Sequence, residues 1–382
     1  MEFSTKKSDL LKELDLTQNV VERKATIPVL SNLLLEVADS SLQLSATDLE
    51  LGVRCGCAAK VKTGGSGTVP AKRLLDIVRS LPEAEIKFKV LENHWVQVNC
   101  ERSSFKLVGM AKDNFPALPS VPKAQAAIPA GILTGLIQRT IFSISSEESR
   151  YTLNGALLVL KPQSALMVAT DGHRLALVES QVEVGGLNNE LRVLIPRKAM
   201  GELQRLLAQV GEKDQVEFAR DESHLFFSSG GPSPGGSGPQ GGRVLISRLL
   251  TGTFPNYEAV LPRENNRLVE LDKDLLTSAV RRVALLADER TRALRVNVDK
   301  DRLEISSSSG DYGEAHETLD ADYSGEPMQI GFNYQYLLDF LGVLGDGDKV
   351  RLELKDEQSA GQLRPLADES YKYRYVVMPM RI

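Results

Sequence analysis

The sequence contains little of what secreted, metal-binding and membrane proteins depend on. Of its 382 residues only three are cysteine (Cys55, Cys57 and Cys100), which is too few for a disulfide framework. Cys55 and Cys57 have no second pair and no nearby histidine that would complete a zinc site. No apolar run approaches the roughly 18 residues that cross a bilayer, and the first residues hold no apolar signal core. We therefore expect three structural thiols in a cytoplasmic protein that binds neither a metal nor a membrane.

The sequence also lacks an excess of positive charge and the motifs of P-loop nucleotide-binding proteins and of metalloproteases. The chain has 46 Lys and Arg against 51 Asp and Glu, and this net charge of −5 excludes a uniformly basic protein that coats nucleic acid. It contains no Walker A motif and no His-Glu-x-x-His motif. The glycine-rich run 63–68 is followed by Val69-Pro70 rather than by Lys and a helix start, which indicates a loop. We expect no cofactor.

What the sequence does contain is an internal repeat of three copies, weak in identity but clear in the order of its elements. Each copy opens with apolar residues at helical spacing, which predicts a helix over 8–21, 130–144 and 274–286. Ser8 and Asp274 are the expected N-caps of the first and third of these helices.

A strand follows each first helix, and a second strand follows after a polar break. The first strands are expected at 31–37, 153–159 and 293–298, and the second at 42–48, 166–171 and 303–308. A second helix then opens after a proline or an aromatic residue, at Pro70, Pro196 and Phe332. Alternating strands close the copies at 86–90, 216–218 and 350–354.

Proline-containing segments mark the linkers between the copies. We predict an α+β protein of three tandem, topologically similar domains at 1–122, 128–262 and 263–382, each with two helices and about eight strands. The middle domain carries a Gly/Pro-rich insert at 228–242 that has no side chains able to build a core. This composition predicts a disordered hairpin tip.

One segment resembles catalytic apparatus, Thr170-Asp171-Gly172-His173-Arg174. His173 oriented by Asp171 could act as a general base, so a repeat-built hydrolase is one hypothesis. No nucleophile motif accompanies the pair, and the matching run 46–49 of the first copy has the Asp without the His. This pattern favours a turn in which the aspartate bonds its own backbone.

Basic residues recur at matching positions of the helices. A helix face with Lys and Arg can contact the phosphates of a nucleic acid without recognising its base sequence. Aromatic residues do not alternate with these basic residues, so the pattern does not indicate base stacking. Solvated helix faces are the alternative interpretation. The residues are Lys72, Arg73, Arg79, Arg139, Arg197, Lys198, Arg205, Arg281 and Arg282, with Lys24 and Arg150 in the loops after first helices.

The two ends of the chain differ in character. Residues 263–382 carry 17 basic and 23 acidic side chains, so they hold the acid excess. This asymmetry suits head-to-tail association, and drift of a solvated surface is the alternative. The last stretch, 375–382, is apolar where termini are commonly polar. It is either a buried final strand or part of an apolar groove that receives a partner.

With these features in place, the chain resembles the family of bacterial DNA polymerase III β subunits, the sliding clamps. The resemblance covers essentially the whole chain in family order, and only the set of matches together is specific. The matching segments are 27–34, 46–50, 69–71, 150–155, 169–176, 195–198, 254–257, 323–325, 330–333 and 376–381.

The resemblance implies a non-enzymatic processivity factor that encircles duplex DNA. Two protomers of three clamp domains each would join head to tail into a ring lined by helices. Closure would keep the ring on DNA, while weak phosphate contacts would let it slide. The implied partners are double-stranded DNA of any sequence, a second copy of the chain, DNA polymerase III alpha and other polymerases, the clamp loader, and mismatch-repair and other proteins with a clamp-binding motif.

The resemblance also implies three sets of site residues. The DNA contacts would be Lys24, Arg73, Arg150, Tyr151 and Lys198, with Lys24 where the family often has Arg and Thr152 where a second Tyr is common. At the dimer interface, Phe105 and Leu107 of one protomer would meet Leu285 and Leu286 of the other. A peptide-binding pocket between the second and third domains would comprise Leu153, Thr170, Gly172, His173, Arg174, Leu175, Pro255, Val260, Tyr323, Val376, Met378, Pro379, Met380 and Arg381.

Two alternatives stay beside the sliding clamp. One is the hydrolase with Asp171 and His173 in its site, and the other is a peptide-binding scaffold that has lost DNA binding. A clamp should be retained on circular DNA even when His173 is replaced by alanine. Peptide binding without retention of the unmodified protein would favour the scaffold.

Overall fold

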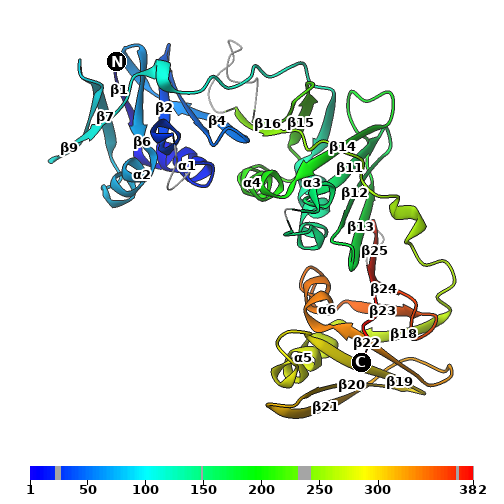
Figure 1. Cartoon of the computed structure of the whole chain (residues 1–382). Coiled ribbons are helices and arrows are strands. Elements are labelled where there is room, and N and C mark those ends of the chain that lie inside the picture. The colour runs from blue at the N-terminus through cyan, green and yellow to red at the C-terminus, as the bar shows by residue number, and fades with distance from the viewer. Residues whose placement is uncertain (22–26, 148, 231–241, 367–369, 382) are drawn as a thin grey trace. The chain divides into compact units, whose positions relative to one another are not determined.

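The computed structural model describes residues 1–21, 27–147, 149–230, 242–366 and 370–381. The chain divides into two compact units, coloured along the chain in Figure 1. The first unit holds 1–134, 184–188 and 198–249, and the second holds 135–183, 189–197 and 250–382. The middle copy of the repeat therefore contributes strands to both units.

In the described part of the chain there are two α-helices for each copy of the repeat. They are α1 (Lys7–Thr17), α2 (Ala71–Ser80), α3 (Ala130–Gln138), α4 (Arg197–Leu207), α5 (Lys273–Val283) and α6 (Tyr334–Leu341). The strands number nine, eight and eight for the three copies over the same described residues. This order of elements confirms the predicted α+β class and the three tandem clamp domains.

The first unit contains two antiparallel sheets. The five-stranded sheet has the order β5 (Lys60–Thr63), β1 (Glu2–Lys6), β7 (Glu85–Val90), β8 (Trp95–Cys100), β9 (Ser103–Val108). The eight-stranded sheet has the order β10 (Ala126–Pro129), β15 (Gln215–Arg220), β16 (His224–Ser229), β17 (Arg243–Arg248), β4 (Leu51–Ala58), β3 (Ser41–Thr47), β2 (Asn32–Ala38), β6 (Gly65–Pro70).

The second unit repeats this plan with one strand fewer in its smaller sheet. The eight-stranded sheet has the order β14 (Leu191–Pro196), β11 (Gly155–Lys161), β12 (Ser164–Thr170), β13 (Arg174–Gln181), β25 (Tyr371–Val377), β24 (Gly361–Pro365), β23 (Lys349–Leu354), β18 (Arg267–Asp272). The four-stranded sheet has the order β21 (Gly313–Asp320), β20 (Arg302–Ser309), β19 (Ala293–Asp299), β22 (Met328–Asn333).

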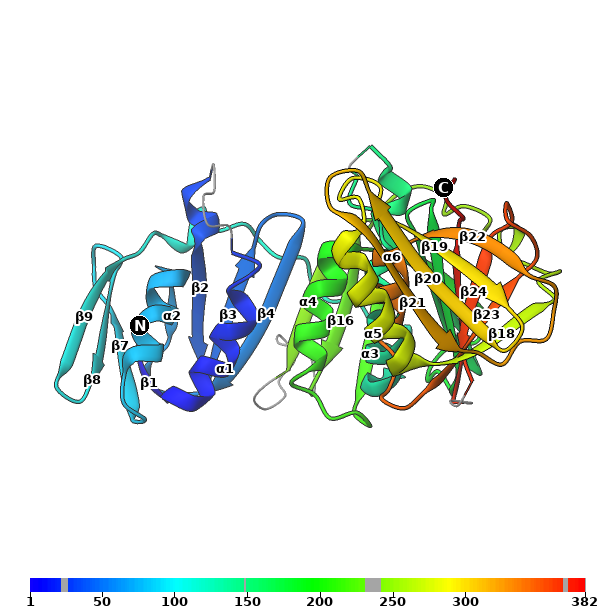
Figure 2. The same cartoon turned by 90° about the horizontal axis from the view of Figure 1, so that it is seen from below.

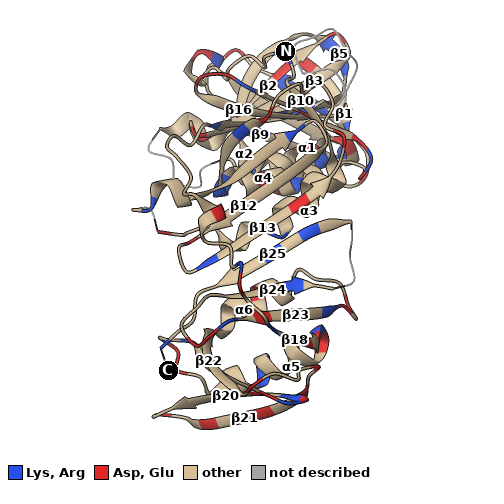
Figure 3. Cartoon of the chain, turned by 90° about the vertical axis from the view of Figure 1, so that its right-hand side faces the viewer, with Lys and Arg blue, Asp and Glu red and all other residues tan. Residues whose placement is uncertain are grey.

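Each eight-stranded sheet joins strands from two copies of the repeat. In the first unit β4 of copy one pairs with β17 of copy two, with Leu51 opposite Ser247. In the second unit β13 of copy two pairs with β25 of copy three, with Arg174 opposite Val377. Figure 3 shows the second of these sheets running without a break from β12 to β18. Backbone hydrogen bonds therefore continue across both boundaries between copies.

Pairs of helices cover the sheets. In Figure 2, α1 and α2 lie side by side over the strands of the first copy, and they bury Leu10, Leu14 and Leu74. In the second unit α5 and α6 contact each other and bury Val280 and Phe340. Leu10, Leu14 and Val280 are among the residues whose helical spacing predicted the first helices.

The ends of the first helices differ from the prediction. Ser8 lies inside α1, whose N-cap Lys6 makes no side-chain cap, and α5 is capped by Asp272, whose side chain accepts hydrogen bonds from the amides of Asp274 and Leu275. Both expected N-caps are therefore wrong, because each helix follows directly from a strand (β1 or β18). The expected C-terminal turns of the third and fifth helices are separate 3₁₀ turns, η3 (Ile141–Ser143) and η6 (Ala284–Leu286).

Three further expectations can be placed. Ser228 and Ser229 belong to β16, so the insert is shorter than 228–242, and its residues 231–241 lie outside the described ranges. All three cysteines are free thiols and buried. Within the described residues, no helix has the length and apolar character that a membrane span needs.

Candidate binding sites

The segment that resembled catalytic apparatus forms a turn held by its own aspartate. Asp171 Oδ1 accepts hydrogen bonds from the amides of His173 (2.9 Å) and Arg174 (3.0 Å). Asp171 Oδ2 accepts from Nε of Arg174 at 3.0 Å. Both carboxylate oxygens are thus engaged away from the His173 ring, which removes the pairing on which the hydrolase hypothesis depends. The predicted Asx-type turn is confirmed.

The first copy contains the same turn between β3 and β4. Asp48 Oδ1 accepts from the amides of Glu50 (2.9 Å) and Leu51 (2.6 Å). The residue after the aspartate has a positive φ in both turns, 76° at Leu49 and 89° at Gly172. Glycine adopts this conformation without strain and leucine does not. The turn is therefore a property of the repeat and not of one chemical site.

The strand pair β13–β25 brings the turn to the C-terminal segment. Leu175 lies opposite Val376, and the amide of Met378 donates to the carbonyl of His173 at 2.9 Å. Val376 and Val377 are buried, whereas Met378 is 44% exposed. The C-terminus is thus a buried final strand as far as Val377, which confirms the first alternative, and Met378 beyond it is exposed.

An apolar cluster underlies this junction. Leu175 and Val376 pack with Phe254 and Tyr257 from the segment that precedes β18. Burial raises the pKa of the Tyr257 hydroxyl, so this side chain remains neutral. Val260, which ends the 3₁₀ turn Tyr257–Ala259, is 47% exposed. The cluster comprises Leu157, Val159, Val168, Leu175, Leu177, Leu194, Phe254, Tyr257 and Val376.

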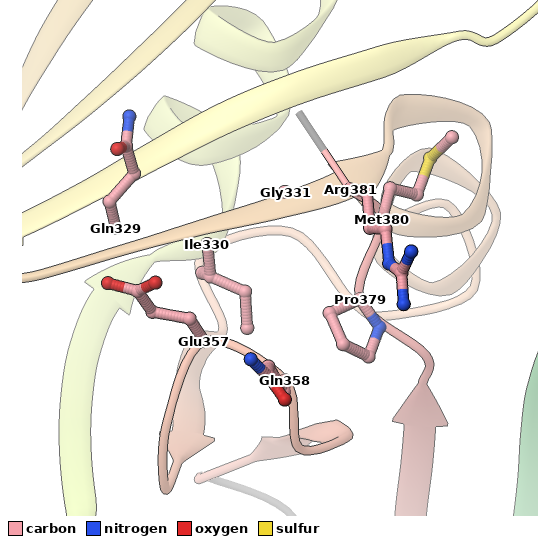
Figure 4. Close-up of a pocket in the computed structure, with 8 residues that line it drawn as sticks. All are labelled: Gln329, Ile330, Gly331, Glu357, Gln358, Pro379, Met380 and Arg381. Carbon is pink, nitrogen blue, oxygen red and sulfur yellow. The ribbon is translucent and has the colours of Figure 1, made fainter.

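The last described residues border a cavity of about 550 Å³ (Figure 4). Pro379, Met380 and Arg381 line one side of it, and the amide of Met380 donates to the carbonyl of Gly331 on β22 at 2.8 Å. The remaining lining residues were not predicted from the sequence, although Ile330 and Gly331 lie within a matched segment. They are Gln329, Ile330 and Gly331 of β22, and Glu357 and Gln358 of the turn between β23 and β24.

Other predicted pocket residues lie around the same turn and junction. Gly172, His173 and Pro255 are exposed. Thr170 is nearly buried, and its hydroxyl donates to the carbonyl of Arg174 at 2.6 Å. Leu153 is half-buried at the end of the 3₁₀ turn Tyr151–Leu153.

Arg174, one of the predicted pocket residues, is largely buried and is held by contacts within the second unit. Its side chain is 9% exposed, and its guanidinium donates to Asp339 Oδ2 (2.5 Å) and to the carbonyl of Phe142 (2.6 Å). Burial alone would lower the pKa of Arg174, but the hydroxyl of Tyr375 and the carboxylates of Asp339 and Asp171 outweigh it and raise the pKa above its ordinary value. Arg174 is therefore a permanent buried cation. Asp339 was missed because it lies 165 positions away in the sequence.

Tyr323, another predicted pocket residue, is buried as well. It is 4% exposed, its hydroxyl donates to the carbonyl of Glu326 at 2.7 Å, and its own carbonyl accepts from the amide of Asp301. These contacts hold it between β21 and β22, and its place in the peptide pocket stays a prediction. The tyrosine beside the turn is Tyr336 of α6, whose ring lies 4.3 Å from the Arg174 guanidinium.

The residues predicted to contact DNA differ in their exposure and in whether they are paired with other groups of the chain. In the first unit Arg73 is exposed on α2, while Lys198 at the start of α4 is half-exposed and ion-paired with the buried Asp48. In the second unit Tyr151 is 54% exposed. Arg150 pairs with Glu147 at 2.9 Å and donates to the carbonyl of Asp171 at 2.6 Å. Lys24 lies outside the described residues.

Several helix cations that recur in the repeat are engaged within the chain. Arg79 pairs with Asp15 at 2.7 Å, Arg205 pairs with Glu202 at 2.6 Å, and Arg282 pairs with Glu317. Arg139 lies 3.8 Å from the ring centroid of Tyr371. Within the described residues, the exposed helix cations that form no ion pair include Lys72, Arg73 and Arg281.

The predicted dimer residues lie at or beside sheet edges. β9 is the edge strand of the five-stranded sheet, and its Phe105 and Leu107 are half-buried. β21 is the edge strand of the four-stranded sheet and contacts the 3₁₀ turn that carries Leu285 and Leu286. Leu285 is 79% exposed. Both strands thus present unpaired backbone groups that could be completed by another chain.

Comparisons with known proteins give one consistent result. Family models match residues 1–119 (DNA polymerase III beta subunit, N-terminal domain), 127–256 (central domain) and 258–381 (C-terminal domain). The beta sliding clamps of Pseudomonas putida and Escherichia coli K12 are 36% and 35% identical over the full length of both chains. A crystal structure of DNA polymerase III subunit beta from Pseudomonas aeruginosa superposes with a TM-score of 0.90 at 35% identity, covering 100% of both chains. A sliding clamp of that organism bound to griselimycin gives a TM-score of 0.91, again at 35% identity and full coverage.

Proposed function

Because the chain belongs to the DNA polymerase III beta subunit family and is a DNA sliding clamp, we propose that two copies close head to tail into a ring around duplex DNA. The ring tethers the replicative polymerase, and other replication and repair proteins, through a pocket at the junction of its second and third domains. The domains are 1–122, 128–262 and 263–382, with the family-model matches and the repeated element order in support.

Head-to-tail closure is supported by the two exposed edge strands, and this is the observation that carries the ring. β9 of the first domain and β21 of the third each lack a partner on one side within the described residues. Pairing β9 of one protomer with β21 of the next would extend both sheets and cover Phe105, Leu107, Leu285 and Leu286. Two such contacts close a ring of two protomers.

Weak, sequence-independent contact with DNA is supported by exposed cations on a chain of net charge −5. Arg73, Arg150, Lys198 and Tyr151, with Lys24, are the proposed contacts. Phosphate contacts of this kind confer no sequence preference and allow sliding. The net negative charge limits adhesion of nucleic acid elsewhere on the protein.

A peptide pocket at the β13–β25 junction is supported by exposed apolar and polar groups above a buried apolar floor. Val260 and Met378 are exposed beside Leu175 and Val376, and His173 is exposed at the turn. A few apolar anchors of a partner peptide could supply most of the binding energy here. The proposed partners are polymerase III alpha and other polymerases, the clamp loader, and mismatch-repair and other proteins with a clamp-binding motif.

We infer further that the protein is a non-catalytic processivity subunit that works in the cytoplasm without a cofactor. The engaged carboxylate of Asp171 supports the absence of acid–base chemistry at His173. The buried, unpaired thiols fit a reducing compartment.

Retention on DNA of defined topology tests the proposal. The protein is loaded with a clamp loader onto nicked circular plasmid, half of which is then linearised, and its mass in solution is measured in parallel. A ring of two protomers stays on the circle and slides off the linear DNA. Equal retention on both DNAs, or a monomeric mass at the loading concentration, would contradict the ring. His173→Ala serves as the control, since it should be retained as the unmodified protein is.

A further inference from the structure

Helix α6 is connected to the turn beside the proposed pocket through one buried arginine. Nη1 of Arg174 donates to Asp339 Oδ2 on α6 at 2.5 Å, and Nη2 donates to the carbonyl of Phe142 at 2.6 Å. Nε donates to Asp171 Oδ2 at 3.0 Å. Three donors of the guanidinium are thus directed to three different segments of the second unit, which fixes its plane.

Aromatic rings and a second set of hydrogen bonds complete this arrangement. The guanidinium carbon lies 4.3 Å from the ring centroid of Tyr336 and 5.5 Å from that of Phe142. The hydroxyl of Tyr375 donates to the carbonyl of Tyr336 at 2.9 Å. Gln335 Nε2 donates to Asp339 Oδ1 at 2.8 Å, so the carboxylate is itself held in orientation.

The same arginine is continuous with the pocket wall. Its Cα lies opposite that of Val377, one step from the hydrogen bond between Met378 and His173. Asp171, which it bonds through Oδ2, uses Oδ1 to hold the amides of His173 and Arg174. A chain of short polar contacts therefore runs from Asp339 through Arg174 and Asp171 to the exposed turn.

The first copy of the repeat has a matching connection with the charges reversed. There, the aspartate of the equivalent turn, Asp48, is ion-paired with Lys198 of α4. In both cases the second helix of the following copy holds the Asx-type turn of the preceding one. The helix supplies the cation at the first junction and the anion at the second, so the connection recurs although its residues do not.

We propose that Asp339 is a positioning residue of the peptide pocket, which it serves through Arg174 without touching the peptide. The inference rests on the proposed function and names a residue that controls its peptide site. Without the carboxylate, the buried guanidinium loses its shortest charged contact and must find another partner or admit water. Asp171 and the turn then lose a fixed neighbour, and the arrangement that receives a peptide is populated less often.

Peptide affinity of the full chain tests the proposal. The probe is a fluorescein-labelled synthetic peptide with the clamp-binding motif of a bacterial polymerase III alpha subunit, titrated by anisotropy. Asp339→Asn should raise its Kd about tenfold and lower the unfolding temperature, because a buried ion pair is broken from one side. Ring mass and retention on circular DNA should stay close to those of the unmodified protein. A Kd that does not change in a folded Asp339→Asn ring overturns the proposal.

Asp48→Asn is the matched control, because it weakens the equivalent connection at the junction where no peptide pocket is proposed. It should leave the Kd unchanged, and an equal rise in both variants would indicate a general loss of order and overturn the proposal. Failure of the unmodified ring to bind the peptide would instead contradict the proposed function. The two failures are therefore distinguishable.

A double-mutant cycle separates positioning from a general structural effect. If Asp339 acts through the turn, Asp339→Asn adds little once His173→Ala has removed the contact of that turn with the peptide. Full additivity of the two variants would overturn the proposed route. Should Asp339→Asn fail to fold, Gln335→Ala removes only the bond that orients the carboxylate. It should raise the Kd about two- to threefold, and an unchanged Kd in that variant would then overturn the proposal.

Discussion

Arg243 of β17 donates two hydrogen bonds to the carboxylate of Glu13 on α1, at 2.6 and 3.1 Å. Their side chains are 16% and 5% exposed, so the pair is buried where the strand of one copy meets the helix of another. Burial opposes the charge on Arg243, but the two contacts with Glu13 outweigh it and raise the pKa of Arg243. Arg243 is thus a permanent cation in the folded protein.

Breaking this pair from one side should be costly. Arg243→Met leaves the Glu13 carboxylate buried without its partner, and we expect a loss of about 3–5 kcal/mol in the free energy of unfolding. Urea denaturation followed by circular dichroism measures it. The double variant Glu13→Leu/Arg243→Met should recover most of the loss, because no unpaired charge remains. A double variant as unstable as Arg243→Met would contradict this account.

The thiol of Cys57 should resist alkylation in the folded protein. Burial raises its pKa from 9.0 to about 11, and the hydroxyl of Thr5 only partly offsets that rise. At pH 8 about one molecule in a thousand then carries the thiolate, which is the reactive form. Iodoacetamide labelling read by mass spectrometry should therefore be slow until urea unfolds the chain. Rapid labelling of folded protein at pH 8 would show that the thiol is accessible and ionised.

The same pKa gives a direction for stability at high pH. A thiol whose pKa is raised on folding stays neutral while the unfolded thiol ionises. Its contribution to stability is therefore complete below pH 9 and is lost as the pH rises toward about 11. Denaturation midpoints measured from pH 8 to 10.5 should fall more steeply for the unmodified protein than for Cys57→Ala.

Arg73 should contribute to DNA affinity while its neighbour Arg79 should not. Arg73 is exposed on α2 without an ion pair, whereas Arg79 on the same helix is paired with Asp15 at 2.7 Å. Arg73→Gln should reduce the slope of log K against log salt by about one unit for binding to a short duplex. Fluorescence anisotropy from 20 to about 150 mM salt measures the slope. Equal slopes for Arg73→Gln and Arg79→Gln would contradict the proposal that Arg73 contacts DNA.

Leu285 should be required for dimer formation. Its side chain is 79% exposed beside the edge strand β21, and an arginine there would place a charge in an apolar interface. Leu285→Arg should shift the sedimentation profile from dimer to monomer at micromolar concentration. Leu275→Arg is the control, since Leu275 is also exposed (59%) but lies near the start of α5 and not on the 3₁₀ turn of Leu285. Dissociation by both variants, or by neither, would argue against the proposed interface.

The helices and strands were largely predictable because the repeat shows each element three times. The prolines at 70 and 196 placed α2 and α4 within a residue of their observed starts. The N-caps were missed because a strand runs directly into α1 and α5, and sequence patterns do not show where the strand stops. The turn at Asp171 was predicted correctly, since its hydrogen bonds are local and its copy at Asp48 lacks the histidine.

The pocket was predicted less well because it depends on contacts between distant segments. The resemblance correctly brought Leu175 and Val376 together, and the register of β13 with β25 confirms that they are neighbours. It could not show that Arg174 faces inward to Asp339, because only the packing of α6 decides that. It also could not show that the guanidinium of Arg174 contacts the ring of Tyr336 on α6.

The continuous sheets have a consequence for how this architecture can be rearranged. Because β4 pairs with β17 and β13 pairs with β25, a cut at either boundary between copies exposes a strand that is normally internal. The middle copy alone would have two such exposed strands, β13 and β17, and it should aggregate unless both are covered. When related genes recombine, a product should therefore fold best if both strands of each pair, β4 with β17 and β13 with β25, come from the same parent gene.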